Sequence, residues 1–294
     1  YVDQAGRRRR IAGRRGGVLA TGGLERDEAR RRRHFPPSPD WPDYVASPPG
    51  NTGDGHVMAE RAGGRLHHMD QANLSPAIPK KDGAGGRNGA PSALSVYFHR
   101  DCHAILIGPD GHRFVDEQCP NMGEVMASVS PSTATASHVP AWCIGDSRLL
   151  RHAPVLRWYI RGQASWFQTA SSIAGRARLS GVAPAALQKT VQIYNQDCLA
   201  GQDRQFGRDT ATLCRLEHAP YVAIPFARAF VSTKGGPMTN VHGQVERSDG
   251  SVIPGLYCAG VAMANPMGTR AVTLGTTLGP NLTWGYICGT SLCG

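Results

Sequence analysis

Two glycine-containing segments lie near the start of the chain, and the glycines of the first could let the backbone approach a ligand. Residues 18–20 form a short apolar run that Gly22 and Gly23 close, a pattern typical of a buried parallel strand followed by a tight turn. Residues 51–55 (NTGDG) precede a helical stripe over 56–63. Glycine carries no side chain, so it lets the backbone approach a ligand closely. The turn at Gly22 and Gly23 is therefore a candidate ligand-binding turn.

A second candidate lies near the end of the chain, where an apolar helix is predicted to begin. Thr277 is a predicted N-cap and Pro280 falls in the first turn. A helix N-terminus presents free N–H groups and a partial positive charge. The sequence therefore predicts a site for an electron-rich ligand atom at this terminus.

The cysteines and histidines do not predict a metal centre. The eight cysteines form no Cys-x-x-Cys pair, and Cys288 and Cys293 have no histidine nearby in the sequence. They are interpreted as reduced thiols of a cytoplasmic protein. His67, His68 and His242 are interpreted as exposed loop residues rather than catalytic bases.

The net charge of +10 is local. Residues 1–33 hold eleven arginines against four acids, so +7 of the +10 lies there. Arg30–Arg33 are interpreted as a solvated helix end, and a nucleic-acid patch over residues 7–33 is the weaker alternative. We therefore predict no nucleic-acid partner. No apolar run reaches the roughly 18 residues needed to cross a bilayer, so no membrane span is predicted.

The elements expected to position these segments change in character along the chain. The pattern over residues 93–229 predicts an α+β segment. It contains a hairpin at 104–115, a short strand at 141–144 and the clearest helix of the sequence at 184–198. From residue 230 the sequence predicts a small antiparallel unit over 239–246 and a buried strand over 255–260. The 294 residues thus divide into an outer pair of segments and an inserted one.

These pieces and their order resemble the FAD-dependent oxidoreductases that include 3-ketosteroid Δ1-dehydrogenases and fumarate reductase/succinate dehydrogenase-type flavoproteins. The matching phrases are VLATGG (18–23), NTGDG with MAERAG (51–63), GHRFVDE (111–117), GVAPAALQKTVQIYN (181–195), STKGG (232–236), IPGLYCAG (253–260) and TLGPNLTWGYICG (277–289). From Pro184 to the end the phrasing is closest to the ketosteroid dehydrogenase branch.

The resemblance implies an α/β fold with an FAD/NAD(P)-binding Rossmann-like domain split in sequence. Its segments would be residues 1–92 and 230–294, and 93–229 would be an inserted α+β cap domain that binds the substrate. The family's first βαβ unit, which carries a G-x-G-x-x-G turn for the FAD pyrophosphate, has no counterpart here. The chain opens on Tyr1 rather than Met, so we expect it to begin partway into a larger enzyme.

The resemblance also assigns candidate residues. The residues expected to contact FAD are Ala20, Thr21, Gly22, Gly23, Thr52, Gly53, Asp54, Gly55, Gly260, Thr277 and Leu278. Gly275 matches the glycine whose N–H polarises the substrate ketone in steroid dehydrogenases. Asn121 stands at the position where relatives carry a proton-transferring Tyr or Arg. Arg270 is either a ligand for an anionic substrate or a structural arginine.

The implied function is an FAD-dependent dehydrogenase acting on CH–CH groups, with hydride transfer to the flavin N5. The substrate would be a steroid-like ketone or a small carboxylate, and no electron acceptor is indicated. Ala271, Asn121 and Val261 depart from the family pattern. They favour the alternative, a catalytically impaired or non-FAD-binding remnant of the family.

Overall fold

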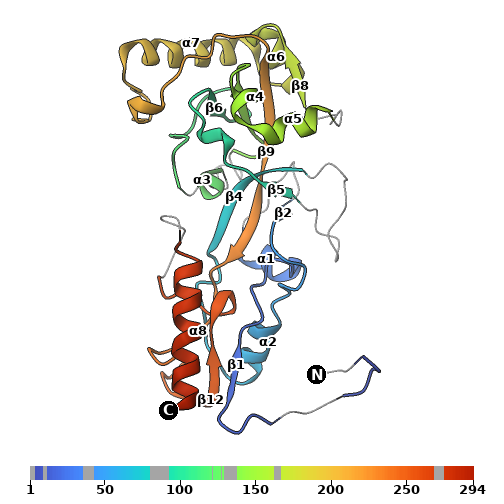
Figure 1. Ribbon diagram of the computed structural model, residues 1–294, viewed down its shortest axis with the longest axis vertical. Coiled ribbons are helices and arrows are strands. Elements are labelled where there is room, and N and C mark those ends of the chain that lie inside the picture. Colours follow the sequence, from blue (N-terminus) through green and yellow to red (C-terminus); the bar gives the residue numbers. More distant parts are fainter. Residues whose placement is uncertain are drawn as a thin grey trace. The chain divides into compact units, whose positions relative to one another are not determined.

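The computed structural model describes residues 4–8, 12–35, 43–79, 93–120, 122–126, 128, 138–161, 167–267 and 275–294. Contacts divide the chain into two compact units (Figure 1). Unit 1 comprises residues 1–24, 50–71 and 233–294, and unit 2 comprises residues 25–49 and 72–232. The second unit is therefore inserted twice into the first.

The unit bounds differ from the predicted segment bounds of 92 and 229. The described residues of 25–49 and 72–79 belong to unit 2 rather than to the unit that holds the rest of the first predicted segment. The reason is that β4 (Ala72–Pro79) and β2 (Tyr44–Val45) pair with the long strand β9 (Tyr221–Thr233). Such long-range pairing leaves no mark in local composition.

Unit 1 is built on a three-stranded sheet of order β1-β12-β11. Its strands are β1 (Gly17–Leu19), β12 (Val252–Cys258) and β11 (Gln244–Glu246). β1 runs parallel to β12 with Leu19 opposite Cys258, and β11 runs antiparallel to β12. A second, two-stranded ladder joins β3 (Leu66–His67) to β10 (Gly236–Pro237).

The prediction that residues 18–20 form a buried strand is correct in its parallel pairing and wrong in its burial. Gly17 and Val18 are exposed, and Leu19 is only half-buried. β1 is an edge strand, since within the described residues it pairs with β12 alone. An apolar run indicates a strand but does not indicate what covers it.

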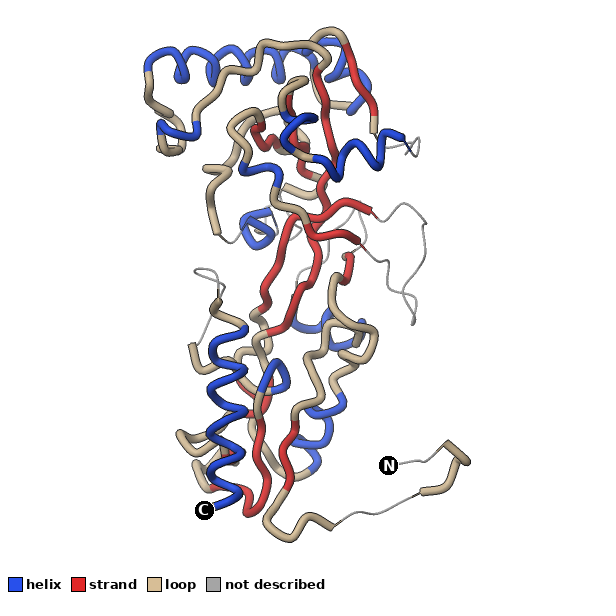
Figure 2. The backbone as a smooth tube through the Cα atoms, viewed as in Figure 1, coloured by secondary structure: helices blue, strands red, loops and turns tan. Residues whose placement is uncertain are grey.

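Two helices complete unit 1, and a short 3-10 turn, η3 (Gly260–Ala262), follows β12. α2 (Asp54–Arg61) begins after Gly53, and α8 (Leu278–Cys293) begins after Thr277 as predicted. Figure 2 shows α8 running alongside β12. Trp284 of α8 packs against a cluster that includes Val245 of β11 and Ile253 of β12. Within the described residues no helix is long and apolar enough to cross a membrane.

Unit 2 is built on a sheet of order β5-β4-β9-β7-β6 with helices on both faces. The remaining strands are β5 (Ala93–Ser95), β6 (Ala104–Ile107), β7 (Ala141–Gly145) and β8 (Gln168–Ala170). The helices are α1 (Glu28–His34), α3 (Met122–Met126), α4 (Leu149–His152), α5 (Pro154–Arg161), α6 (Ile173–Ser180) and α7 (Pro184–Ala200), with 3-10 turns η1 (Phe98–Arg100) and η2 (Thr210–Thr212).

Alternation along β6 separates the two cores of unit 2. Leu106 joins the cluster that Leu149 and Leu156 cover, whereas Ile105 joins the cluster that Leu187 and Tyr194 of α7 cover. Successive strand side chains point to opposite faces, so a continuous apolar strand serves both cores.

The predicted hairpin at 104–115 is wrong in its second half. β6 pairs antiparallel with β7, and only a single bridge joins Ile107 to Arg113.

Arg113 is instead the centre of a buried charge cluster. Its guanidinium donates to both Glu117 oxygens at 3.0 and 2.8 Å and to both Asp203 oxygens at 3.0 Å. Arg208 donates to Glu117 Oε2 at 3.0 Å, so each buried charge meets an opposite one.

Candidate functional site

The predicted turns after β1 and β12 lie at one edge of the unit 1 sheet. The strands are parallel and in register, so their carboxyl ends coincide, and the Ala259 N–H donates to Leu19 O at 3.0 Å. Ala20 follows one strand and Gly260 follows the other. The carboxyl edge of parallel strands is where open α/β sheets bind their ligands.

The N-terminus of α2 joins the first of these turns. The Gly55 N–H donates to Thr21 Oγ1 at 3.0 Å, and the Gly53 N–H donates to Gly23 O at 3.0 Å. Gly53 has φ of 77°, a left-handed conformation that favours glycine. The two phrases VLATGG and NTGDG, separate in sequence, are therefore one structural element.

Steric limits hold this element in one arrangement. Gly22 has φ of +81°, and a Cβ there would lie 2.2 Å from Asn51 Oδ1. Thr52 Oγ1 donates to Asp54 Oδ1 at 3.0 Å and to Gly50 O at 3.3 Å. The backbone angle at position 22 favours glycine, and an added Cβ would also displace the Asn51 side chain.

Lys234 and Gly235, neighbours in the STKGG phrase, together connect the N-terminus of α8 to α2. Its Nζ donates to Thr277 Oγ1 at 2.8 Å and to Thr276 O at 3.3 Å. The neighbouring Gly235 O contacts His56 Nε2 of α2 at 2.9 Å. Thr21, His56, Lys234 and Thr277 thus mark a continuous path through unit 1, which we call the Thr21–Thr277 path.

Lys234 is a buried cation. Its exposed fraction is 2%, and within the described residues no carboxylate forms an ion pair with it. Burial lowers the pKa of Lys234 from its ordinary value. A buried ammonium that lacks an anionic partner is a favourable neighbour for an anionic ligand.

The α8 terminus has the exposed backbone that the sequence predicts. Thr277 is its N-cap and makes no side-chain cap hydrogen bond, and Leu278, the first helical residue, is 70% exposed. Gly275 precedes it with φ of +90°. Among the described residues, no atom lies within 4 Å of where a Cβ would stand at Gly275 or at Gly260. Both glycines therefore leave room for a ligand to approach the backbone.

The structure brings together the predicted residues of segments 20–23 and 52–55, and a separate set of contacts brings together Thr277 and Lys234. Of the three predicted catalytic residues, Gly275 precedes α8, whereas Asn121 and Arg270 lie outside the described residues. Lys234 and His56 were absent from the predicted set. The STKGG phrase was the available signal for Lys234, but a lysine is ordinarily solvated and only the fold shows this one buried.

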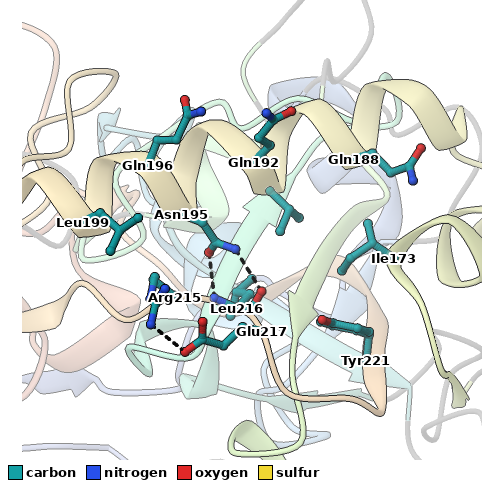
Figure 3. Close-up of a pocket in the computed structure, with 11 residues that line it drawn as sticks. Ile173, Gln188, Gln192, Asn195, Gln196, Leu199, Arg215, Leu216, Glu217 and Tyr221 are labelled. Atoms are coloured by element: carbon teal, nitrogen blue, oxygen red, sulfur yellow. Dashed lines mark hydrogen bonds and ion pairs between the residues drawn. The ribbon is translucent and has the colours of Figure 1, made fainter.

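A separate groove of about 480 Å³ lies in unit 2 along α7. Figure 3 shows Asn195 pointing across it to Leu216, with Arg215, Glu217 and Tyr221 on the facing segment. None of the predicted cofactor residues lines it. The candidate site for the function is therefore the Thr21–Thr277 path, not this groove.

The residues of this path fit FAD in three respects. A buried cation suits an anionic reduced flavin or a phosphate, the free N-terminus of α8 adds partial positive charge, and the space over Gly260 and Gly275 admits a ligand. The donors are uncharged backbone groups, hydroxyls and one ammonium. Such a set binds an organic anion rather than a metal ion.

The fold and this site define the class, a mixed α/β protein of the flavoenzyme type. The chain belongs to the FAD binding domain family, which matches residues 1–278. FAD is accordingly its cofactor.

Several characterised relatives are similar along nearly the whole chain. A 3-oxosteroid 1-dehydrogenase of Mycobacterium tuberculosis is 30% identical over 94% of this chain and 52% of its own length. A fumarate reductase (cytochrome) of Shewanella frigidimarina is 28% identical over 92% of this chain and 44% of its own. The crystal structure of a 3-ketosteroid Δ1-dehydrogenase from Sterolibacterium denitrificans, in complex with 1,4-androstadiene-3,17-dione, superposes with a TM-score of 0.80. It is 27% identical and covers 95% of this chain and 53% of that one. The chain thus spans about half the length of these relatives.

Proposed function

We propose that the chain is part of an FAD-dependent dehydrogenase that acts on CH–CH groups, closest in activity to 3-ketosteroid Δ1-dehydrogenases. The substrate would be a steroid-like ketone, with a small carboxylate as the second class, since both ketosteroid dehydrogenases and fumarate reductases are similar to it. The observation that carries the proposal is the buried Lys234 ammonium at the α8 terminus. The electron acceptor is not assigned.

Unit 1 would be the Rossmann-like FAD domain and unit 2 the substrate cap. Support for the first comes from the parallel β1–β12 pair with its two ligand-binding turns. Support for the second comes from the antiparallel β6–β7–β9 sheet, which is inserted in sequence and carries its own cores. A cytoplasmic location is proposed because all eight cysteines are free thiols.

When bound, FAD supplies the hydride acceptor of the reaction. The chain's own residues would bind and orient it. Thr21 Oγ1 and the α2 terminus would hold the dinucleotide, while Lys234 and the α8 terminus would stabilise negative charge on the flavin. The Gly275 N–H, with no side chain in the way, would donate to the substrate carbonyl oxygen.

The competing function is a remnant that keeps the fold without catalysis, favoured by Ala271 and Val261. Titration of FAD into the chain, followed by flavin fluorescence and absorbance, separates the two. Stoichiometric binding, followed by flavin reduction on adding a 3-ketosteroid or flavin reoxidation on adding fumarate, supports the enzyme. A folded chain that binds FAD but shows neither reaction supports an impaired relative. A folded chain that binds no FAD, even when it is extended by an N-terminal βαβ unit with a G-x-G-x-x-G turn, contradicts the proposal.

A further inference from the structure

Two cysteines and a histidine meet in unit 2, whereas the residues assigned above to FAD belong to unit 1. The ligand atoms of Cys102, His103 and Cys214 all lie within 4.8 Å of one another. Cys102 and His103 are adjacent, but Cys214 comes from a segment that lies between η2 and β9. The spacing of the cysteines in the sequence therefore could not predict this cluster, because its ligands come from two distant segments.

His103 has an unsatisfied nitrogen within the cluster. The residue is 8% exposed, and its Nδ1 atom is buried with no hydrogen-bond partner in the part of the chain that the structure describes. Leaving a buried polar atom unpaired costs about 1–3 kcal/mol. An imidazole nitrogen is also a good metal ligand, so a bound cation would remove this cost.

The loop that carries Cys102 and His103 is held by backbone hydrogen bonds. The His103 N–H donates to Asp101 Oδ1 at 2.8 Å, and the Ala104 N–H donates to Asp101 O at 3.1 Å. Arg208 Nη2 donates to the same carbonyl at 3.0 Å. The two ligands therefore sit on a preorganised turn rather than on a free surface loop.

The segment that carries Cys214 is fixed from the other side. The Leu216 N–H donates to Asn195 Oδ1 at 2.8 Å, and Asn195 Nδ2 donates back to Leu216 O at 3.0 Å, the pair of bonds drawn in Figure 3. Arg148 Nη2 also donates to Arg215 O. Cys214 is therefore anchored to α7 and to the start of α4.

Two sulfurs and one imidazole are the ligands that Zn²⁺ prefers over Mg²⁺ or Ca²⁺. Tetrahedral zinc, with bonds of about 2.0–2.3 Å, places its ligand atoms about 3.5–3.8 Å apart. The three ligand atoms already lie within 4.8 Å of one another, so a small rearrangement of the side chains would bring them to these separations. Cys102 and Cys214 are partly exposed, so the ion has a path in and a fourth position stays open.

A carboxylate stands behind His103, as in many zinc sites. The ligand atoms of Asp101, His103 and His152 also lie within 4.8 Å of one another, and His152 Nδ1 contacts Asp101 Oδ2 at 2.9 Å. Metal-bound histidines ordinarily have such an outer carboxylate or carbonyl, which fixes the ring orientation. The Arg148 and Arg208 guanidiniums are also nearby and carry positive charge, but each donates to a carboxylate, Asp146 and Glu117 respectively.

We propose that Cys102, His103 and Cys214 form a Zn²⁺ site in unit 2, with water or an external ligand in the fourth position. Binding releases the two thiol protons and ties the 101–103 turn to the segment before β9. The site is independent of the FAD function, because it shares no residue with the Thr21–Thr277 path.

The experiment measures zinc in the full chain, purified without a metal-affinity tag and kept reduced with a phosphine. After exchange into zinc-free buffer, the wild type should retain equimolar zinc by elemental analysis. Replacement by Co²⁺ should give the intense thiolate-to-cobalt charge-transfer absorption together with tetrahedral d–d bands. A strong chelator should lower the melting temperature of the wild type, because zinc binds only the folded state.

The variants C102S and C214S remove one ligand each and leave the side-chain size nearly unchanged. Both should lose the zinc, the cobalt charge-transfer band and the response of the melting temperature to chelator. The matched control is C119S, a half-buried thiol of the same unit outside the cluster, which should behave as the wild type. Circular dichroism shows whether each variant is folded. A folded, reduced wild type without zinc, or zinc retained equally by C102S and C214S, would overturn the proposal.

Discussion

The Lys234 ammonium donates a 2.8 Å hydrogen bond to Thr277 Oγ1, so a buried charge lies directly at the first turn of α8. Two sources of positive potential therefore coincide in unit 1, the ammonium and the helix N-terminus. This pairing indicates where the chain would hold an electron-rich group, and the first prediction follows from it.

Replacing Lys234 with Met should make the flavin harder to reduce. Loss of a nearby positive charge should shift the midpoint potential of bound FAD by tens of millivolts in the negative direction, where 30 mV corresponds to about 1.4 kcal/mol for two electrons. The measurement is a spectroscopic redox titration. K189M, which removes an exposed lysine of α7, is the control.

The same variant should not unfold the apoprotein. Burial lowers the pKa of Lys234, which means that burying the charged ammonium reduces the free energy of unfolding. Met carries no charge and removes this cost. Urea unfolding of the FAD-free K234M chain should show equal or greater stability at neutral pH. Strong destabilisation together with an unchanged flavin potential would mean that Lys234 has only a structural role.

Gly22→Ala should damage the first cofactor turn more than its backbone angle alone explains. Gly22 and Gly250 both have φ of +81°, but a Cβ at Gly22 would lie 2.2 Å from Asn51 Oδ1, whereas at Gly250 it meets nothing within 4 Å. Each variant should lose about 1 kcal/mol to the left-handed backbone. G22A should lose more stability than G250A by urea unfolding, and it alone should weaken FAD affinity. Equal affinity in both variants would remove the turn from the cofactor site.

Removing one charge from the buried cluster around Arg113 should strongly destabilise unit 2. Arg113→Met leaves Glu117 and Asp203, which are 0% and 4% exposed, without their main partner. Breaking a buried pair in this way costs about 3–5 kcal/mol. The control is R32M, which breaks an exposed i,i+4 pair with Glu28 and should cost under about 1 kcal/mol. A small effect of R113M in chemical unfolding would show that water reaches the cluster.

His99 should make unit 2 sensitive to acid. It is fully buried, and among the described residues neither ring nitrogen has a hydrogen-bond partner. Burial, assisted by Arg100 and Arg208, lowers its pKa from 6.5 to about 3. As pH falls, the unfolded chain binds this proton first. Stability is therefore lost progressively from about pH 6.5 towards pH 3.

At pH 5 the His99 contribution amounts to a loss of about 2 kcal/mol relative to pH 7. Unfolding with urea at both pH values should show that H99Q has a smaller difference than the wild type. H112Q, at an exposed histidine, should leave the difference unchanged. If H99Q and the wild type respond equally to acid, another group controls the acid response.

Much of the local structure could be predicted from sequence, because its signals are local. The helix predicted at 184–198 is α7, Pro184–Ala200, since proline starts it and the apolar period continues through it. The N-cap at Thr277 and the parallel pairing of residues 17–19 were also predictable. The prediction of a strand at 113–115 was wrong. The Arg113 side chain is held in a buried charge cluster by Asp203, which is too distant in sequence for a local pattern to indicate it.

By itself, the sequence determined the family, the cofactor and the glycine turns, because these depend on short phrases whose residues act through backbone shape. The tertiary structure alone decided which groups are buried and which distant groups meet. It buried Lys234 beside Thr277, paired β4 and β2 with β9, and brought Cys214 to Cys102 and His103. Burial and long-range contact are what convert a surface lysine or a reduced thiol into a group with distinct chemistry, and neither is encoded in local spacing.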